Sequence, residues 1–167
     1  EYSSPNVGKP FHIGHIRSTI LGDAIKRLLE SCGAKVISFN YPGDSGTQVA
    51  KLVLALELKK AAPKDEKQLL KLYQWIHKEL EKKPEELGEQ VRKVSDLIEA
   101  QDAKTLGVVE KIREISFRSF DKSYRKLGVK FDEVVGESKF FANAKQKAIE
   151  AKALAPRWSV GEPKKGE

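Results

Sequence analysis

Apolar residues in the first third of the chain form two different patterns. Five of them recur at spacings of three and four: Ile13, Ile16, Ile20, Ala24 and Leu28. This spacing predicts an amphipathic helix over residues 12–31, because side chains three and four apart lie on one helix face. Residues 35–41 instead have the β-branched and aromatic character of a short buried strand, which a Pro-Gly-Asp turn ends. A second helix is predicted over residues 46–60.

From Ala61 onward, helix-forming residues dominate the chain. Two apolar stripes separated by Pro84 predict two helices. The stripes consist of Leu69, Tyr73, Ile76 and Leu80, and of Val91, Val94, Leu97 and Ile98. A third helix is predicted over residues 107–128, followed by a strand-like segment over 129–135 and a short helix over 142–153.

The order of these elements predicts an α/β fold. An extended segment precedes Pro5, and the order strand, helix, strand, helix is typical of a right-handed parallel α/β unit. Ligands of such units bind where the carboxyl ends of strands meet the amino ends of helices. We therefore expect a ligand site at that edge, where the loops over residues 5–11 and 42–46 lie.

Composition excludes two broad classes of protein. The 167 residues are 40% hydrophobic and 33% charged, which is too apolar for a disordered chain and too polar for a membrane protein. The single cysteine, Cys32, has no partner for an intrachain disulfide, and no signal peptide is recognisable. We expect a cytoplasmic protein with no membrane partner, although the mitochondrial matrix fits the same pattern, and we expect Cys32 to be a small buried side chain.

Positive charge is concentrated in the second part of the chain. Residues 1–57 carry 6 basic and 5 acidic side chains, whereas residues 58–167 carry 25 and 19. A positive excess favours polyanions such as RNA. Because the charges are interleaved with acids along predicted helices, a solvated helix surface explains them more simply.

The residues with the clearest chemical meaning lie at the start of the first predicted helix. His12 and His15 bracket Ile13 and Gly14 after a loop that contains Lys9. Histidines three apart lie on adjoining sides of the first turn, where free backbone N–H groups and the helix dipole favour an anion. Gly14 lets a flat ring or a ribose approach the backbone, and Lys9 adds a mobile positive charge. The pattern predicts a phosphate-binding site.

This stretch resembles a known family. The residues His12-Ile13-Gly14-His15 match the HIGH signature of class I aminoacyl-tRNA synthetases. Neighbouring segments narrow the resemblance to arginyl-tRNA synthetases: Glu1-Tyr2-Ser3-Ser4-Pro5-Asn6, Arg17-Ser18-Thr19, Leu21-Gly22-Asp23 and Asn40-Tyr41-Pro42-Gly43-Asp44-Ser45-Gly46-Thr47-Gln48. The resemblance is dense over residues 1–50 and continues more thinly to Ser138.

The resemblance implies the first half of a Rossmann-like class I synthetase catalytic fold with a mainly helical insertion. Together with the change of composition near Ala61, it divides the chain into three parts. Residues 1–60 correspond to the N-terminal half of the catalytic domain, residues 61–155 to the helical connective insertion, and residues 156–167 to a loop or tail.

The resemblance also implies an enzyme, an arginine–tRNA ligase of protein synthesis. Such an enzyme uses ATP with Mg²⁺ to convert L-arginine to arginyl-adenylate and then transfers arginine to tRNA(Arg). Lys9, His12, Gly14 and His15 match the ATP-binding positions of the family, and we expect Lys9, His12 and His15 to act in catalysis. No cluster in the sequence has the spacing of metal ligands, so magnesium is expected to arrive with ATP.

The arginine-binding positions of the family match Glu1, Ser4, Asn6 and, again, His15. A carboxylate such as Glu1 suits a guanidinium group because it accepts two parallel hydrogen bonds. Asn6 can bond an α-amino or a carboxylate group.

The chain departs from the family pattern at two places. Ser45 stands where the family usually has tryptophan, and no segment matches the lysine-rich loop that completes the ATP site. We therefore expect a fragment that is inactive by itself. Two alternatives remain open: a non-catalytic RNA-binding or assembly module derived from a synthetase, and a small nucleotidyltransferase with a similar His-x-Gly-His turn.

Overall fold

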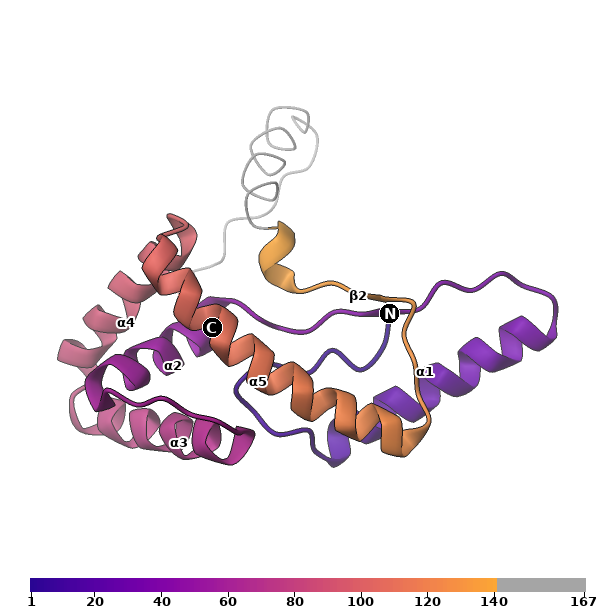
Figure 1. The fold of residues 1–167 in the computed structure, drawn as a ribbon, viewed down its shortest axis with the longest axis horizontal. Coiled ribbons are helices and arrows are strands. Elements are labelled where there is room, and N and C mark those ends of the chain that lie inside the picture. Colours follow the sequence, from indigo (N-terminus) through magenta and orange to yellow (C-terminus); the bar gives the residue numbers. More distant parts are fainter. Residues whose placement is uncertain (141–167) are drawn as a thin grey trace, which may run out of the picture.

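The computed structural model describes residues 1–140, which form one group of helices and a narrow parallel sheet (Figure 1). In chain order the elements are α1 (Ile13–Ser31), β1 (Phe39–Asn40), α2 (Gly46–Lys59), α3 (Glu66–Lys82), α4 (Pro84–Glu99), α5 (Ala103–Leu127), β2 (Glu133–Val134) and a 3-10 turn, η1 (Glu137–Phe140). The helix expected over residues 142–153 and the tail from residue 156 lie outside the described residues.

Residues 2–7, β1 and β2 run side by side in the same direction. The first of these segments was expected to be extended, but Ser3 and Ser4 interrupt it with φ values of +86° and +46°. β1 pairs with β2, with Phe39 opposite Glu133. On its other edge, the Phe39 carbonyl accepts a hydrogen bond from the Tyr2 N–H at 3.2 Å, and the Gly43 carbonyl accepts one from the Val7 N–H at 3.0 Å. Segment 38–43 therefore lies between two parallel neighbours, which confirms the predicted α/β order.

The regular strands are much shorter than expected. Strand geometry covers two residues each in β1 and β2, instead of residues 35–41 and 129–135. Pro42 has no N–H to donate toward the β2 side, and Pro5 has none to donate toward segment 38–43. The prolines interrupt the ladder at the edge where we expected the functional loops.

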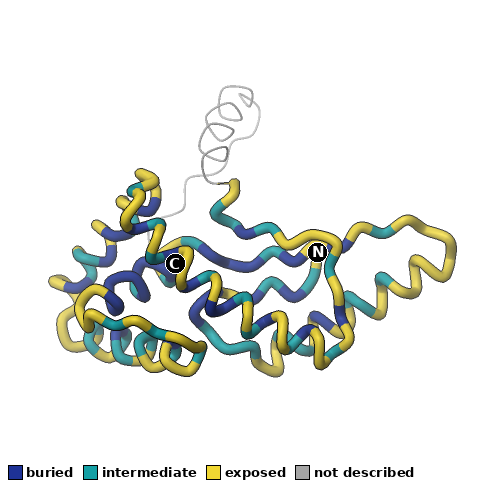
Figure 2. Tube along the Cα trace, viewed as in Figure 1, coloured by how far each residue is buried: buried dark blue, intermediate teal, exposed yellow. Residues whose placement is uncertain are grey.

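Helix α2 is the centre of the hydrophobic core. Seven of its 14 residues are buried: Val49, Ala50, Leu52, Val53, Leu54, Ala55 and Leu56. They pack against the buried faces of α3, α4 and α5, which include Leu69, Ile76, Val91, Val94 and Ile112. Figure 2 shows this concentration of buried positions along α2. The boundary expected between residues 60 and 61 stays a prediction, although α2 packs directly on the helices that follow it.

Helix α1 has the predicted position but an exposed apolar face. Six of its large apolar side chains are at least 45% exposed: Ile13, Ile20, Leu21, Ile25, Leu28 and Leu29. Thr19 is its one buried residue. The periodicity therefore predicted the helix correctly, and the described residues leave most of its apolar surface uncovered.

Three local expectations were wrong. Helix α5 begins at Ala103 instead of Gly107, because Asp102 caps it by accepting a hydrogen bond from the Thr105 N–H at 2.8 Å. Leu97 is 45% exposed, because the buried face of α4 follows Val91, Val94 and Ile98. Cys32 is exposed at the end of α1.

A polar cluster joins α1 to the sheet. Asp132 accepts hydrogen bonds from the Ser38 hydroxyl at 2.6 Å and the Ser38 N–H at 2.7 Å. The ammonium of Lys26, on α1, lies 3.3 Å from the same carboxylate oxygen. These contacts, led by the Ser38 hydroxyl, lower the pKa of Asp132 from 3.8 to about 2.

This cluster should make the fold acid-sensitive. The stabilisation from Asp132 is fully present above the unfolded pKa near 3.8, and it is lost as the pH falls through the folded pKa of about 2. We expect Asp132→Asn to lose stability at neutral pH and to converge on the original chain between about pH 4 and about pH 2. Urea midpoints across that range measure the effect. A stability difference that stays constant with pH would contradict it.

None of the helices in the described part of the chain is both long enough and apolar enough to cross a membrane.

Candidate functional site

The loop before α1 is fixed by the helical core. Val7 is buried, and the Gly8 N–H donates to the hydroxyl of Ser116, on α5, at 2.9 Å. Gly8 has a φ of +76°, and an added Cβ would overlap the side chain of Leu52, on α2. Glycine is therefore favoured here, both by the positive φ and by the lack of room for a side chain beside Leu52. The predicted ATP loop is held by α2 and α5, which belong to different parts of the sequence.

His12 and His15 lie together at the amino end of α1. Their ring centroids are 3.9 Å apart. The Gly14 N–H donates to Nδ1 of His12 at 3.2 Å, and the His12 N–H donates to Nδ1 of His15 at 3.2 Å. The two side chains therefore cap the first turn of their own helix reciprocally.

This capping determines which ring nitrogen can act on a ligand. Because Nδ1 accepts a backbone hydrogen bond in both rings, the proton of each neutral imidazole resides on Nε2. Among the described residues, neither Nε2 donates to an acceptor. His12 and His15 therefore offer two N–H donors beside a positive helix end, which is an arrangement that suits phosphate oxygens.

Burial keeps His15 neutral. Its pKa is lowered by burial, and in addition by the nearby His12 and Lys9. Phe11 stacks on the His15 ring, with centroids 5.3 Å apart, and also meets the Tyr124 ring edge-on at 5.4 Å. The ring of His15 is thus oriented by packing as well as by its hydrogen bond.

Lys9 contacts Tyr73, for which the sequence pattern indicated only a packing role. Its ammonium lies 5.2 Å from the ring centroid of Tyr73, on α3. The Tyr73 hydroxyl donates to Oε1 of Gln48, on α2, at 2.6 Å. No signal in the sequence links positions 9 and 73, because the contact depends on how α3 folds back.

Of the expected arginine-binding residues, Glu1, Ser4 and Asn6 lie on the segment before α1, and His15 lies on α1 itself. The Ser4 hydroxyl donates to the Glu1 carboxylate, and the Ser4 N–H donates to the Asn40 side chain at 3.1 Å. Asn6 forms a parallel bridge with Gly43, where an added Cβ would overlap the Asn6 side-chain oxygen. Glu1 and Asn6 are exposed. The structure thus groups Glu1 with Ser4, places Asn6 on the neighbouring loop, and groups His12 with His15.

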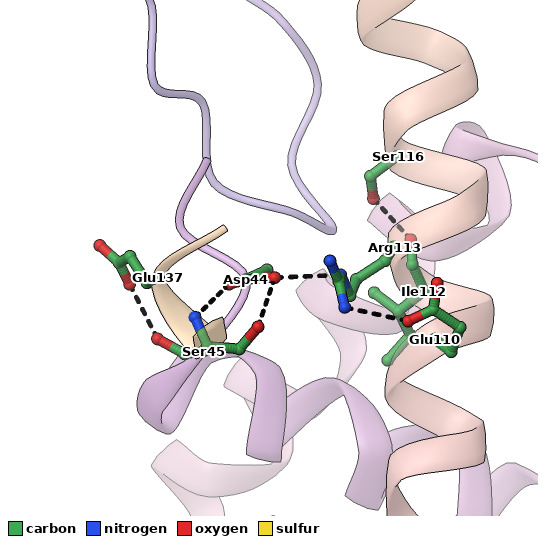
Figure 3. Close-up of polar contacts among 8 residues, drawn as sticks. Asp44, Ser45, Glu110, Ile112, Arg113, Ser116 and Glu137 are labelled. Carbon is green, nitrogen blue, oxygen red and sulfur yellow. Dashed lines mark hydrogen bonds and ion pairs between the residues drawn. The ribbon is translucent and has the colours of Figure 1, made fainter. Parts of the chain in front are cut away.

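Asp44 and Glu137, which sequence analysis left unassigned, join the second loop to α5 and η1 (Figure 3). Asp44 is buried, and its carboxylate accepts hydrogen bonds from the N–H and the hydroxyl of Ser138, each at 2.8 Å. Nε of Arg113, on α5, lies 3.0 Å from the same carboxylate, but its N–H has no hydrogen-bond acceptor among residues 1–140, so this contact is electrostatic.

Ser45, at the position where the family usually has tryptophan, belongs to this same connection. Its hydroxyl donates to the Glu137 carboxylate at 2.8 Å. A polar contact with η1 therefore takes the place of an aromatic side chain in this loop.

A hollow in the described part of the chain lies away from these residues. It has a volume of about 590 Å³ and lies between the end of α5 and β2, with Phe120, Tyr124, Val129 and Phe131 among its walls. None of the residues expected to bind ATP or arginine lines it. Among the described residues, no group of three or more His, Cys, Asp or Glu side chains is placed to hold a metal ion.

Comparison with known proteins assigns the family. The model of the family "tRNA synthetases class I (R), catalytic domain" matches residues 1–155. An arginine–tRNA ligase of Halothermothrix orenii is 40% identical over 156 residues, which cover 90% of this chain and 27% of the relative. The chain thus spans about a quarter of the length of the curated relatives it matches.

Solved structures agree with this match. Arginyl-tRNA synthetase from Plasmodium falciparum superposes with a TM-score of 0.78 at 27% identity, over 99% of this chain and 29% of that one. The Thermus thermophilus arginyl-tRNA synthetase gives 0.71 at 27% identity, over 99% of this chain and 27% of that one. The partial Rossmann-like architecture is therefore confirmed, and the chain belongs to the class I (R) tRNA synthetase catalytic-domain family.

Proposed function

We propose that this chain is the ATP- and arginine-binding part of an arginine–tRNA ligase. The observation that carries the proposal is the closely packed, mutually capping pair His12 and His15, which leaves two Nε2–H donors at the amino end of α1. The complete enzyme would form arginyl-adenylate from arginine and ATP, and would transfer the arginine to tRNA(Arg). Its compartment would be the cytoplasm.

The chemistry of adenylate formation requires no nucleophile from the protein. The arginine carboxylate attacks the α-phosphorus of ATP, a new C–O–P linkage forms, and the bond to pyrophosphate breaks. The protein positions the reactants and stabilises the negative charge on the transferring phosphoryl group. His12 and His15 would donate from Nε2 to its oxygens, and Lys9 would neutralise further phosphate charge. Mg²⁺ would accompany ATP as part of the substrate.

Arginine would bind beside this pair. Glu1 supplies a carboxylate for the guanidinium group, and the hydroxyl of Ser4 already contacts that carboxylate. Asn6 is exposed and adjoins Gly43, so its amide is available to a polar group of the amino acid. His15, which is part of the cap, would lie between the two ligands.

Calorimetry of this chain with ATP·Mg²⁺, arginine and a non-hydrolysable arginyl-adenylate analogue tests the proposal. We expect the analogue to bind at least about 10²-fold more tightly than ATP or arginine alone, because it joins both ligands in one molecule. Citrulline, which lacks the positive charge, is the matched control for arginine and should bind at least about tenfold more weakly.

Two outcomes would contradict the proposal. Nucleotide binding without preference for the arginyl analogue would favour a nucleotidyltransferase. RNA binding with no affinity for ATP or for the analogue would favour a non-catalytic RNA-binding module.

A further inference from the structure

We propose that Tyr73, on helix α3, is a positioning residue for ATP, which acts by holding the Lys9 ammonium in place. The proposal rests on the function proposed above, in which Lys9 binds ATP. It assigns a specific task to a helix that sequence analysis placed in the connective insertion.

The first contact that carries this inference is between Lys9 and the Tyr73 ring. The ammonium lies 5.2 Å from the ring centroid, within the range of a cation–π interaction. A lysine side chain has four flexible bonds, and fixing them on ligand binding costs entropy. Because Tyr73 restricts Lys9 before ATP arrives, it lowers that cost.

The second contact is between the Tyr73 hydroxyl and Gln48, at 2.6 Å. Gln48 lies in the first turn of α2, directly after the loop that contains Gly43 and Asp44. Lys9 belongs to the other loop at this edge. The hydroxyl therefore anchors the Tyr73 ring to α2, while the face of the ring meets Lys9 in the first loop.

His77, which packs on Tyr73, does not compete with Lys9 as a cation at the Tyr73 ring. His77 packs on Tyr73, with ring centroids 4.4 Å apart, and its Nε2 is buried with no partner among the described residues. Burial lowers the pKa of His77, and the charges of Lys51 and Lys9 lower it further against an opposing effect of Glu81. His77 is therefore neutral at pH 7, in contrast to the solvated histidine that its charged neighbours in the sequence suggest.

The same helix provides a matched control. Trp75 is two residues from Tyr73, packs against the same core, and has the Lys59 ammonium 4.3 Å from its ring centroid. Lys59 is at the end of α2 and belongs to neither loop of the site. Trp75→Leu therefore removes a similar cation–π contact and a similar amount of packing without touching Lys9.

The experiment compares ATP and arginine affinities of this chain in five variants. We expect Tyr73→Leu to weaken ATP binding about fivefold and to leave arginine binding within about twofold, from the usual strength of a partly buried cation–π contact. Tyr73→Phe keeps the ring and should retain most of the ATP affinity. Trp75→Leu should leave ATP affinity within about twofold. Lys9→Ala combined with Tyr73→Leu should bind ATP no more weakly than Lys9→Ala alone, because the two act through one contact.

The outcomes separate this inference from the function it rests on. If the original chain fails to bind ATP, or Lys9→Ala has no effect, the proposed function fails and this inference fails with it. If Lys9→Ala weakens ATP binding while Tyr73→Leu does not, or weakens it only as much as Trp75→Leu, the inference alone is overturned. A nuclear Overhauser effect between the Lys9 ε-protons and the Tyr73 ring in the original chain tests the contact without any variant, and its absence would also overturn the inference.

Discussion

His12→Asn should lower the rate of arginyl-adenylate formation by about 10²- to 10³-fold, the usual effect of removing one donor aimed at developing charge. Arginine affinity should change less than about twofold, because the donor acts on the phosphoryl group as charge builds up. ATP–pyrophosphate exchange, measured in the complete ligase that carries this chain, reports the rate. Equilibrium binding of arginine to the same variant reports the affinity.

The choice of asparagine separates chemistry from folding. His12 is the N-cap of α1, and its Nδ1 accepts a hydrogen bond from the Gly14 N–H. Asparagine is a favourable N-cap and retains an acceptor for that N–H, whereas His12→Ala should lose about 1 kcal/mol of stability together with the ring. Equal losses of exchange rate and arginine affinity in His12→Asn would reject the assigned role.

Local patterns predicted the parts of this fold that depend on neighbours in the chain. The period of three and four residues placed α1 and the buried faces of α3 and α4, and Pro84 marked the beginning of α4. The paired histidines were also predictable, because a helix start brings positions three apart together regardless of what surrounds it. Their close approach and mutual capping follow from that same local geometry.

Contacts between distant segments could not be predicted in this way. Tyr73 fits an apolar stripe, so its sequence context explains its burial and hides its contact with Lys9. Asp44 and Arg113 are separated by about as many residues as Lys9 and Tyr73, and the residues around each of them give no indication of the contact. In both cases the contact forms because a later helix folds back onto a loop: α3 onto the loop with Lys9, and α5 onto the loop with Asp44.

Exposure of apolar surface shows a different limit of the sequence pattern. The stripe on α1 predicts a face suited to burial, and Ile13 is nevertheless 78% exposed. Periodicity states which side chains share a face, but it does not state which segment covers that face. The described residues cover a neighbouring side of α1, where Thr19 is buried.

Asp44→Asn should destabilise the chain by about 3 kcal/mol, at the lower end of the range for breaking one partner of a buried ion pair. The substitution keeps the shape of the side chain, but it removes the charge opposite Arg113 and presents an N–H₂ group to donors from Arg113 or Ser138. Arg113 is 28% exposed and also contacts Glu110 at 3.0 Å, so part of its charge remains compensated. Urea unfolding monitored by circular dichroism measures the loss.

Asp121→Asn is the matched control for this prediction, because it removes a similar aspartate–arginine contact from the same helix. Asp121 lies 2.6 Å from Arg125, but the two side chains are 54% and 79% exposed. Water replaces most of that interaction, so the loss should stay below about 1 kcal/mol. The large difference between the two variants follows from the burial of Asp44 and from its two hydrogen bonds with Ser138. Equal losses of stability in both variants would contradict the prediction. The second loop would then be held mainly by its backbone contacts with Pro5 and Val7.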